Sequence, residues 1–168
     1  LAVLSNIQAQ GISVQFGIPL REAERERTRF LDLFPVVKRR LEESSVYGGV
    51  RGYATVVSGL RRKTEKPGRQ SYWANNFLRN TPIQGSAAVI FKTAIVRLDQ
   101  AFRGTDVWLV LPVHDAILLE CSADRVEEVA AKAATIMEEA MHTLYPKLKP
   151  RVDVNKSHPE CWNKNGHA

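Results

Sequence analysis

The sequence has few cysteines and no long hydrophobic run. Its 168 residues include only two cysteines, which excludes a disulfide framework and favours a reducing compartment. No apolar stretch approaches the roughly 20 residues that a membrane span requires. The opening residues, LAVLSNIQAQ, lack the basic region that begins a secretory signal peptide. These absences exclude membrane-spanning and disulfide-rich secreted proteins, so we expect a cytoplasmic protein.

The composition is otherwise ordinary for a soluble globular domain. Hydrophobic residues make up 44% and charged residues 25% of the chain, and 168 residues are enough for one domain with a core. The chain does not begin with Met and opens within an apolar run. We therefore expect it to be a piece of a longer protein.

Basic residues are in excess, and they cluster. The net charge is +6 and the isoelectric point is about 9.5. The clustered cations are Arg61, Arg62, Lys63, Lys66 and Arg69 in one segment and Lys147, Lys149 and Arg151 in another. Such clusters favour a polyanionic partner, although a basic surface can also serve solubility alone.

Three residues of types that ligate metals lie close together near the end of the sequence: His158, Cys161 and His167. A structural zinc site usually has four ligands at tighter spacing. We therefore do not expect zinc at this segment.

The stretch from residue 107 to residue 121 reads VWLVLPVHDAILLEC, in which two short apolar runs flank a polar point. Each run is too short for a typical helix and rich in residues that suit sheets. The pattern predicts an antiparallel hairpin with His114 and Asp115 at or beside its turn. Because apolar residues stand at successive positions, we expect both faces of the hairpin to be covered.

The polar pair at this turn has two interpretations. A carboxylate and an imidazole at the end of a rigid hairpin suit a metal or substrate contact. Asp is also common in turns because its side chain bonds nearby backbone amides, and His114 could make a similar structural bond. The residues of the hairpin alone do not decide between these interpretations.

Helical patterns fill most of the remaining sequence. We expect a charged helix over residues 21–34 after Pro19 and a second helix over 36–43, with glycines 48, 49 and 52 ending the helical region. Phe30, Leu31, Phe34 and Val37 are spaced for one buried stripe. A hairpin is expected over residues 53–62, with its turn at Ser58 and Gly59.

The second half of the sequence predicts two long helices and a final strand. One helix starts afresh at Pro82 with Asn80 or Thr81 as its cap, and Gln84 and Ser86 stand in its first turn, where free amides favour a phosphate or a base edge. A capping role is the alternative for Gln84. Another helix over 124–144 begins with a capping box of Asp124 and Glu127, and residues 151–154 form a last strand.

Four sequence blocks together resemble one family. In chain order the blocks are GYATVVSGLRR, PIQGSAA, VHDAILLE and the tail VDVNKSHPECWNKNGHA. They are similar to the carboxyl-terminal blocks of family A DNA polymerases, the class of bacterial DNA polymerase I, and they occur in the same order. The resemblance implies an α+β fold: a palm-like antiparallel sheet whose central hairpin packs on long helices, plus a helical remnant of the fingers. Residues 1–46 would be the end of the fingers and residues 47–168 the carboxyl-terminal part of the palm.

The resemblance also implies roles for particular residues. Asp115 would hold catalytic Mg²⁺ in a two-metal transfer of deoxynucleotides, from their triphosphates, to a primer 3′ end. The second carboxylate of that site would lie outside this chain, in the upstream remainder of the polymerase, because Glu120 stands roughly 16 Å along the strand from Asp115. The residues that would contact the template–primer DNA are His114, at the primer terminus, Gln84 and Asn80, in the minor groove, and Arg61 and Arg62.

Four positions depart from the family pattern. Ser5 and Asn6 stand where a Tyr-Gly pair is usual, Val89 stands where many relatives have Asp, and Ala116 stands where many have Glu. The resemblance then implies that this chain lacks the nucleotide-binding fingers helix and does not polymerise by itself. It also implies that the parent enzyme is of bacterial or phage type and is associated with the nucleoid. Two alternatives stay open: a non-catalytic DNA-binding remnant or accessory subunit, and an unrelated basic RNA-binding protein, although no RRM or KH signature is present.

Overall fold

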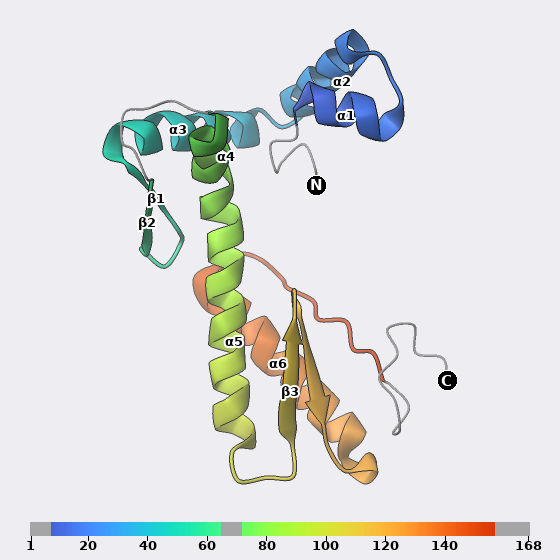
Figure 1. The fold of residues 1–168 in the computed structure, drawn as a ribbon. Coiled ribbons are helices and arrows are strands. Elements are labelled where there is room, and N and C mark those ends of the chain that lie inside the picture. The colour runs from blue at the N-terminus through green and yellow to red at the C-terminus, as the bar shows by residue number, and fades with distance from the viewer. Residues whose placement is uncertain (1–7, 65–71, 157–168) are drawn as a thin grey trace. The chain divides into compact units, whose positions relative to one another are not determined.

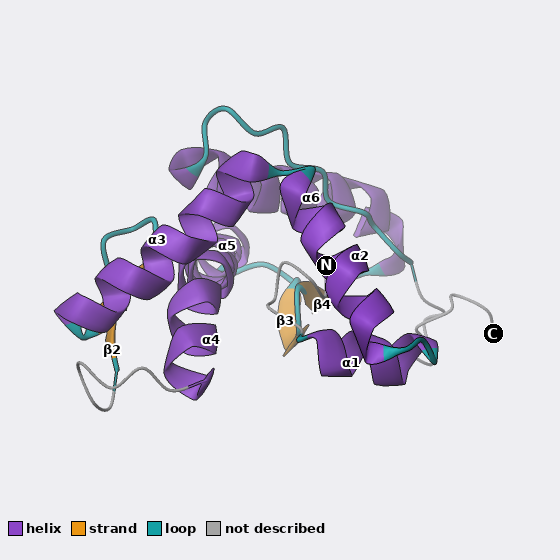
Figure 2. Cartoon of the chain, turned by 90° about the horizontal axis from the view of Figure 1, so that it is seen from above, coloured by secondary structure: helices purple, strands orange, loops and turns teal. Residues whose placement is uncertain are grey.

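The structure is a computed structural model that describes residues 8–64 and 72–156 (Figure 1). Helices predominate, and the strands form two small antiparallel hairpins (Figure 2). The chain divides into two compact units, unit 1 (Leu1–Ser86) and unit 2 (Ala87–Ala168). In the part of the chain that the structure describes, no helix is both long enough and apolar enough to span a membrane. The expected α+β class is confirmed.

Unit 1 consists of helices and one short hairpin. Its elements are α1 (Ala9–Phe16), α2 (Leu20–Asp32), α3 (Pro35–Arg51), β1 (Tyr53–Thr55), β2 (Arg61–Lys63), α4 (Tyr72–Asn80) and the π-helical turn η1 (Thr81–Gly85). The charged helix after Pro19 is confirmed as α2. Of the expected apolar stripe, Leu31 is buried, but Phe34 is 46% exposed because the chain leaves the helix there.

Helix α3 is longer than the sequence predicted. It runs through Gly48 and Gly49 and ends only at Gly52, whose φ of 75° lies in the left-handed region. Gly48 is retained inside the helix because α3 and α4 approach closely: a Cβ at Gly48 would lie 2.4 Å from Cδ2 of Leu78. Helix α3 thus continues across residues 46 and 47, and the expected boundary between fingers and palm at that point stays a prediction.

The hairpin of unit 1 is confirmed. Tyr53 pairs with Lys63 and Thr55 pairs with Arg61 in an antiparallel register. The connection closes through a backbone bond from the N–H of Val56 to the carbonyl of Leu60, 2.9 Å, and Gly59 supplies the positive φ that the turn requires.

Unit 2 packs a second hairpin against two helices. Its elements are α5 (Ser86–Phe102), which begins at the last residue of unit 1, β3 (Trp108–Val113), β4 (Ala116–Glu120), the 3₁₀ turn η2 (Ala123–Arg125) and α6 (Val126–Leu144). The core cluster consists of Leu98, Phe102, Val107, Val129 and Ala133, with Leu109, Ile117 and Leu119 of the hairpin packed against it. The predicted hairpin and the presence of both long helices are therefore confirmed.

The expectation that both faces of this hairpin are covered is wrong for the residues described. The side chains of Trp108, Val110 and Leu111 are 68%, 50% and 45% exposed. Within residues 8–64 and 72–156 this sheet has two strands, and α5 and α6 cover the face that carries Leu109 and Ile117. A continuous apolar run marks a strand, but it does not reveal whether a second layer lies on the other face.

Two smaller expectations are also wrong. Asp124 and Glu127 do not form a capping box, because Asp124 lies in η2 and the N-cap of α6 is Arg125, which makes no side-chain capping bond. Residues 151–154 form no strand, because no strand among the described residues pairs with them. The N–H of Val152 instead donates to the carboxylate of Glu138, 3.0 Å.

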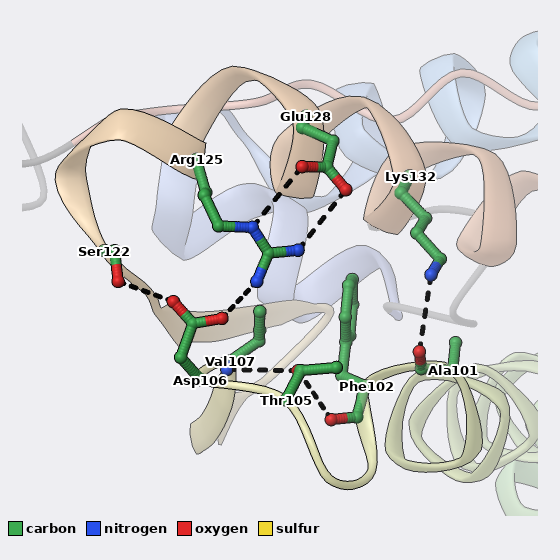
Figure 3. Close-up of polar contacts among 9 residues, drawn as sticks. All are labelled: Ala101, Phe102, Thr105, Asp106, Val107, Ser122, Arg125, Glu128 and Lys132. Carbon is green, nitrogen blue, oxygen red and sulfur yellow. Dashed lines mark hydrogen bonds and ion pairs between the residues drawn. The ribbon is translucent and has the colours of Figure 1, made fainter.

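The open end of the β3–β4 hairpin is tied to α6 by a polar cluster (Figure 3). Asp106 precedes β3 and Ser122 follows β4, and the Ser122 hydroxyl donates to the Asp106 carboxylate, 2.5 Å. Arg125 donates to the same carboxylate and also to Glu128, 3.3 Å. We call these four residues the clamp. It fixes the two ends of the hairpin to each other and to the start of α6.

The helices behind the hairpin are also linked (Figure 3). The ammonium of Lys132 in α6 donates to the carbonyl of Ala101 in α5, 3.3 Å, and lies 5.1 Å from the centre of the Phe102 ring. Thr105 accepts from the N–H of Val107, 3.2 Å, at the entry to β3. The hairpin is therefore anchored at its base on both helices.

The contact of α3 with α4 at Gly48 generates a stability prediction. Gly48→Ala is expected to lower the free energy of unfolding by about 1–2 kcal/mol, because Leu78 is only 1% exposed and has no room to move from the added methyl group. Gly49→Ala is the matched control. Nothing lies within 4 Å of its Cβ position, so Ala should raise the free energy of unfolding by about 0.5–1 kcal/mol. Urea unfolding followed by circular dichroism measures both, and equal stability of the two variants would contradict the close approach.

The clamp generates a prediction for acid stability. The hydrogen bond from Ser122 and the charge of Arg125 lower the pKa of Asp106. The carboxylate therefore stabilises the fold above about pH 3.9, the ordinary value for Asp, and this stabilisation disappears as the pH falls through the lowered pKa. The Tm difference between the wild type and Asp106→Asn should be largest near about pH 6 and shrink toward about pH 3. The control is Asp99→Asn, which removes an exposed ion pair with Arg103 and should change Tm little.

Candidate functional site

The tip of the β3–β4 hairpin is a two-residue turn made of His114 and Asp115. The last pair of the ladder joins Val113 to Ala116, so the turn projects from the end of both strands. Both side chains are exposed. His114 has a φ of 55°, and it is the one non-glycine residue with positive φ in the part of the chain that the structure describes. The predicted position of both residues is thus confirmed.

The backbone of His114 is strained for its residue type. Two-residue hairpin turns require positive φ and usually place Gly or Asn there. A non-glycine residue held in this region costs about 1–3 kcal/mol, and such residues gather at functional sites. The strain is tolerated because the paired strands, with Val113 opposite Ala116, hold both ends of the turn.

The ladder below the turn contains an irregularity. The register shifts between Leu109 and Leu111, which leaves Val110 out of the regular pairing. Bulges of this kind increase local twist and are frequent next to functional sites, where they redirect side chains. Glu120 pairs with Trp108 at the opposite end of the hairpin from Asp115, so the two carboxylates stand at different ends.

The segment that carries Asn80 and Gln84 differs from its prediction. Pro82 does not start a new helix: the chain stays helical from α4 through η1 into α5, and Asn80 makes no capping bond. The first-turn amides of a separate helix are therefore not available there for a phosphate. The π turn accommodates Pro82, which has no backbone N–H to donate. Such turns occur often at functional sites.

Within this segment the structure separates buried residues from exposed ones. Ser86 is only 2% exposed, so it does not meet a ligand from solvent, contrary to the expectation from the first turn. Gly85 is in close contact with Val56, the residue that follows β1, since a Cβ there would lie 2.5 Å from Cγ1 of Val56. Gln84 is exposed and Asn80 is half-buried. Gly85 and Ser86 thus serve packing, and Gln84 faces solvent.

The arginines of the β1–β2 hairpin stack on aromatic rings. The Arg61 guanidinium lies 4.8 Å from the centre of the Tyr53 ring, and the Arg62 guanidinium lies 4.5 Å from that of Phe77 in α4. A third pair joins Arg51 to Tyr47 in α3, 5.7 Å. Among the residues described, none of these arginines forms a salt bridge, whereas Arg39 and Arg40 of α3 both pair with Glu43.

Stacking on a ring leaves the donors of a guanidinium available. The ring supports the flat face, and the five N–H groups at the edge remain free to bind an anion. Arg61 and Arg62 are exposed, so this surface is suited to phosphate groups. The sequence analysis named Arg61 and Arg62 but not Arg51. The alternation of arginines with Tyr47, Tyr53 and Phe77 could have indicated all three stacked pairs.

The predicted site residues fall in both units. Arg61, Arg62, Asn80 and Gln84 belong to unit 1, whereas His114 and Asp115 belong to unit 2. Across residues 8–64 and 72–156, no group of three His, Cys, Asp or Glu side chains could hold a metal ion. The segment with His158, Cys161 and His167, and the departures at Ser5 and Asn6, lie outside the described residues.

Known proteins match nearly the whole chain. Residues 2–164 match the family described as DNA polymerase family A. The chain is 34% identical to the thermostable DNA polymerase I of Thermus thermophilus over 166 residues, which are 95% of this chain and 19% of that protein. It is 32% identical to the DNA polymerase I of Deinococcus radiodurans over 152 residues, 86% of this chain and 16% of that protein.

A solved structure is also similar. It is the POL domain of Pol1 from M. smegmatis in complex with DNA primer-template and dNTP, with a TM-score of 0.75 and 29% sequence identity over 83% of this chain and 26% of that one. The chain thus spans about a fifth of the length of the curated relatives given above. The order of its sequence blocks, its fold and these matches agree: the chain belongs to DNA polymerase family A.

Proposed function

We propose that this chain is the carboxyl-terminal part of a template-directed DNA polymerase that adds deoxynucleotides to a primer 3′ end. Residues 1–46 form the end of its fingers and residues 47–168 the carboxyl-terminal part of its palm. The observation that carries the proposal is the exposed His114–Asp115 turn at the tip of a clamped hairpin, in a chain that belongs to this family. Relatives named DNA polymerase I support the same activity.

In this proposal Asp115 holds Mg²⁺. Its carboxylate is exposed at the tip and supplies the hard oxygen ligands that Mg²⁺ prefers. Asp115 is a single carboxylate, so a second one comes from a part of the enzyme outside residues 1–168. When bound, two such ions stabilise charge on the attacking and leaving oxygens of phosphoryl transfer. His114, beside the carboxylate, contacts the primer terminus.

Unit 1 supplies further contacts to the template–primer. Arg61 and Arg62 bind backbone phosphates with the guanidinium edges that their stacked rings leave free. Gln84 and Asn80 donate to acceptors in the minor groove, which are nearly the same for every base pair. A polymerase must bind any sequence, and such degenerate contacts meet that requirement.

The second candidate function is DNA binding without catalysis by the chain itself. The observation that favours it is the departure from the family pattern at Ser5, Asn6 and Val89. Ala116, where many relatives have a Glu beside the catalytic Asp, favours it as well. The two candidates agree on the DNA contacts and differ on the role of Asp115.

The arginine contacts are tested by salt dependence. Arg62→Ala should weaken binding of the chain to a labelled primer–template and reduce the slope of log K against log salt by about 1, because one phosphate contact is lost. Arg39→Ala is the matched control, since it removes the same charge from an arginine that pairs with Glu43, 3.8 Å. Fluorescence anisotropy at several salt concentrations measures both. Equal slopes for the two variants would show that only net charge matters.

The metal role is tested in the polymerase that contains these residues. Asp115→Asn is expected to lower primer extension by several orders of magnitude while binding of primer–template persists, because the amide cannot replace the charged ligand. Glu120→Gln, at the far end of the same hairpin, is the control and should keep near-normal turnover. The 168-residue chain alone should give no extension with Mg²⁺ and deoxynucleotides. Near-normal turnover of Asp115→Asn would favour the second candidate.

A further inference from the structure

Ser86 is a buried polar residue between two elements that carry proposed DNA contacts. Its side chain is 2% exposed, and it follows η1, the turn that bears Gln84. The hairpin that bears Arg61 and Arg62 lies on its other side, because the N–H of Val57, just after β1, donates to the Ser86 hydroxyl, 3.0 Å. The hydroxyl is thus shared between the turn and the hairpin.

The Ser86 hydroxyl also replaces a backbone hydrogen bond of the regular α-helix that is absent at the π turn. In a regular α-helix the N–H of residue 86 would donate to the carbonyl of Pro82, four residues earlier. Here that N–H donates to the carbonyl of Ile83, and the Ser86 hydroxyl donates to the carbonyl of Pro82. With this one hydroxyl, Ser86 therefore stabilises η1 as a donor and accepts a hydrogen bond from the hairpin.

Two further contacts join the hairpin to this helical segment. Val56 packs on Gly85, where no Cβ stands in the way, and the Arg62 guanidinium stacks on Phe77 of α4. The π turn needs such support, because the Thr81 hydroxyl is buried without a hydrogen-bond partner among the residues described. A buried polar group in that state destabilises the turn.

We propose that Ser86 is a positioning residue: its hydroxyl holds the arginine hairpin and the Gln84 turn in one fixed arrangement for binding duplex DNA. The inference rests on the proposed function, because it assigns Ser86 a role in DNA binding through residues that the proposed function places on the DNA. Ser86 itself does not touch the DNA, since it is buried. Ser86 affects DNA binding by fixing the positions of Gln84 and Arg62.

A matched pair of substitutions isolates the hydroxyl. Ser86→Thr keeps the hydroxyl, and Ser86→Val has nearly the same shape without it, so the two variants differ in hydrogen bonding and share their extra bulk. Hydrogen exchange of the 168-residue chain is the first readout. The Val57 amide should exchange about fivefold faster or more in Ser86→Val than in Ser86→Thr, while amides of α6 keep the same rates in both.

A double-mutant cycle separates positioning from general stability. Gln84→Ala is measured in the wild-type, Ser86→Thr and Ser86→Val backgrounds by anisotropy with a labelled primer–template. It should weaken binding by about fivefold in the first two backgrounds and by much less in Ser86→Val, because an unanchored turn no longer presents Gln84 to the DNA. A merely structural Ser86 would leave the effect of Gln84→Ala equal in all three.

The outcomes distinguish the inference from the function on which it rests. If Gln84→Ala has no effect in the wild-type background, the proposed DNA contact fails and the inference fails with it. If Gln84→Ala weakens binding equally in all backgrounds, or the Val57 amide is equally protected in Ser86→Thr and Ser86→Val, the positioning role alone is overturned. Should Ser86→Val not fold by circular dichroism, Ser86→Ala takes its place in both measurements.

Discussion

The packing of the β3–β4 hairpin on α5 and α6 is the interaction on which the candidate site depends. Leu98 and Phe102 of α5 and Val129 of α6 form a cluster against Leu109 and Ile117 of the hairpin. A two-stranded hairpin alone is marginally stable in water, so this one-sided burial keeps the strands extended. The clamp then fixes the open end, and the tip with His114 and Asp115 has a defined place relative to its own helices.

In unit 1 glycines let neighbouring segments approach closely, whereas in unit 2 the elements pack through large apolar side chains. Gly48 lets α3 lie directly on Leu78 of α4, and Gly85 lets Val56 lie directly on η1. Both contacts would be blocked by a methyl group. The segments so joined carry arginines stacked on rings, and the stacking orders long side chains that would otherwise lose more freedom on binding an anion. In this unit the close backbone packing and the stacked arginines occur in the same segments.

The sequence was sufficient for the elements whose pattern is local. The turn at His114 and Asp115, the charged helix α2 and the presence of the long helices α5 and α6 follow from residue spacing and turn residues, and family membership followed from short blocks such as PIQGSAA. The errors concern contacts between segments distant in sequence. Whether the outer face of β3 is covered, and whether residues 151–154 find a partner strand, depends on neighbours that local spacing does not reveal.

The π turn was missed for a different reason. Pro82 is typical of a helix start, and Asn80 and Thr81 are suitable caps, so local rules favoured a new helix. The structure keeps one helical path because Ser86 and Gly85 connect the turn to a hairpin some thirty residues earlier, with Val57 and Ser86 separated by 29 positions. Local propensity was overruled by a tertiary hydrogen bond.

The uncovered face of β3 has a consequence for the chain in solution. Trp108, Val110 and Leu111 stand out from a two-stranded sheet whose outer edges are unpaired among the residues described. Open strand edges beside apolar side chains are templates on which a second molecule adds its own strand. Mutual repulsion from the net charge of +6 opposes this self-association, and added salt screens that repulsion. The purified chain should therefore be handled dilute and at low ionic strength.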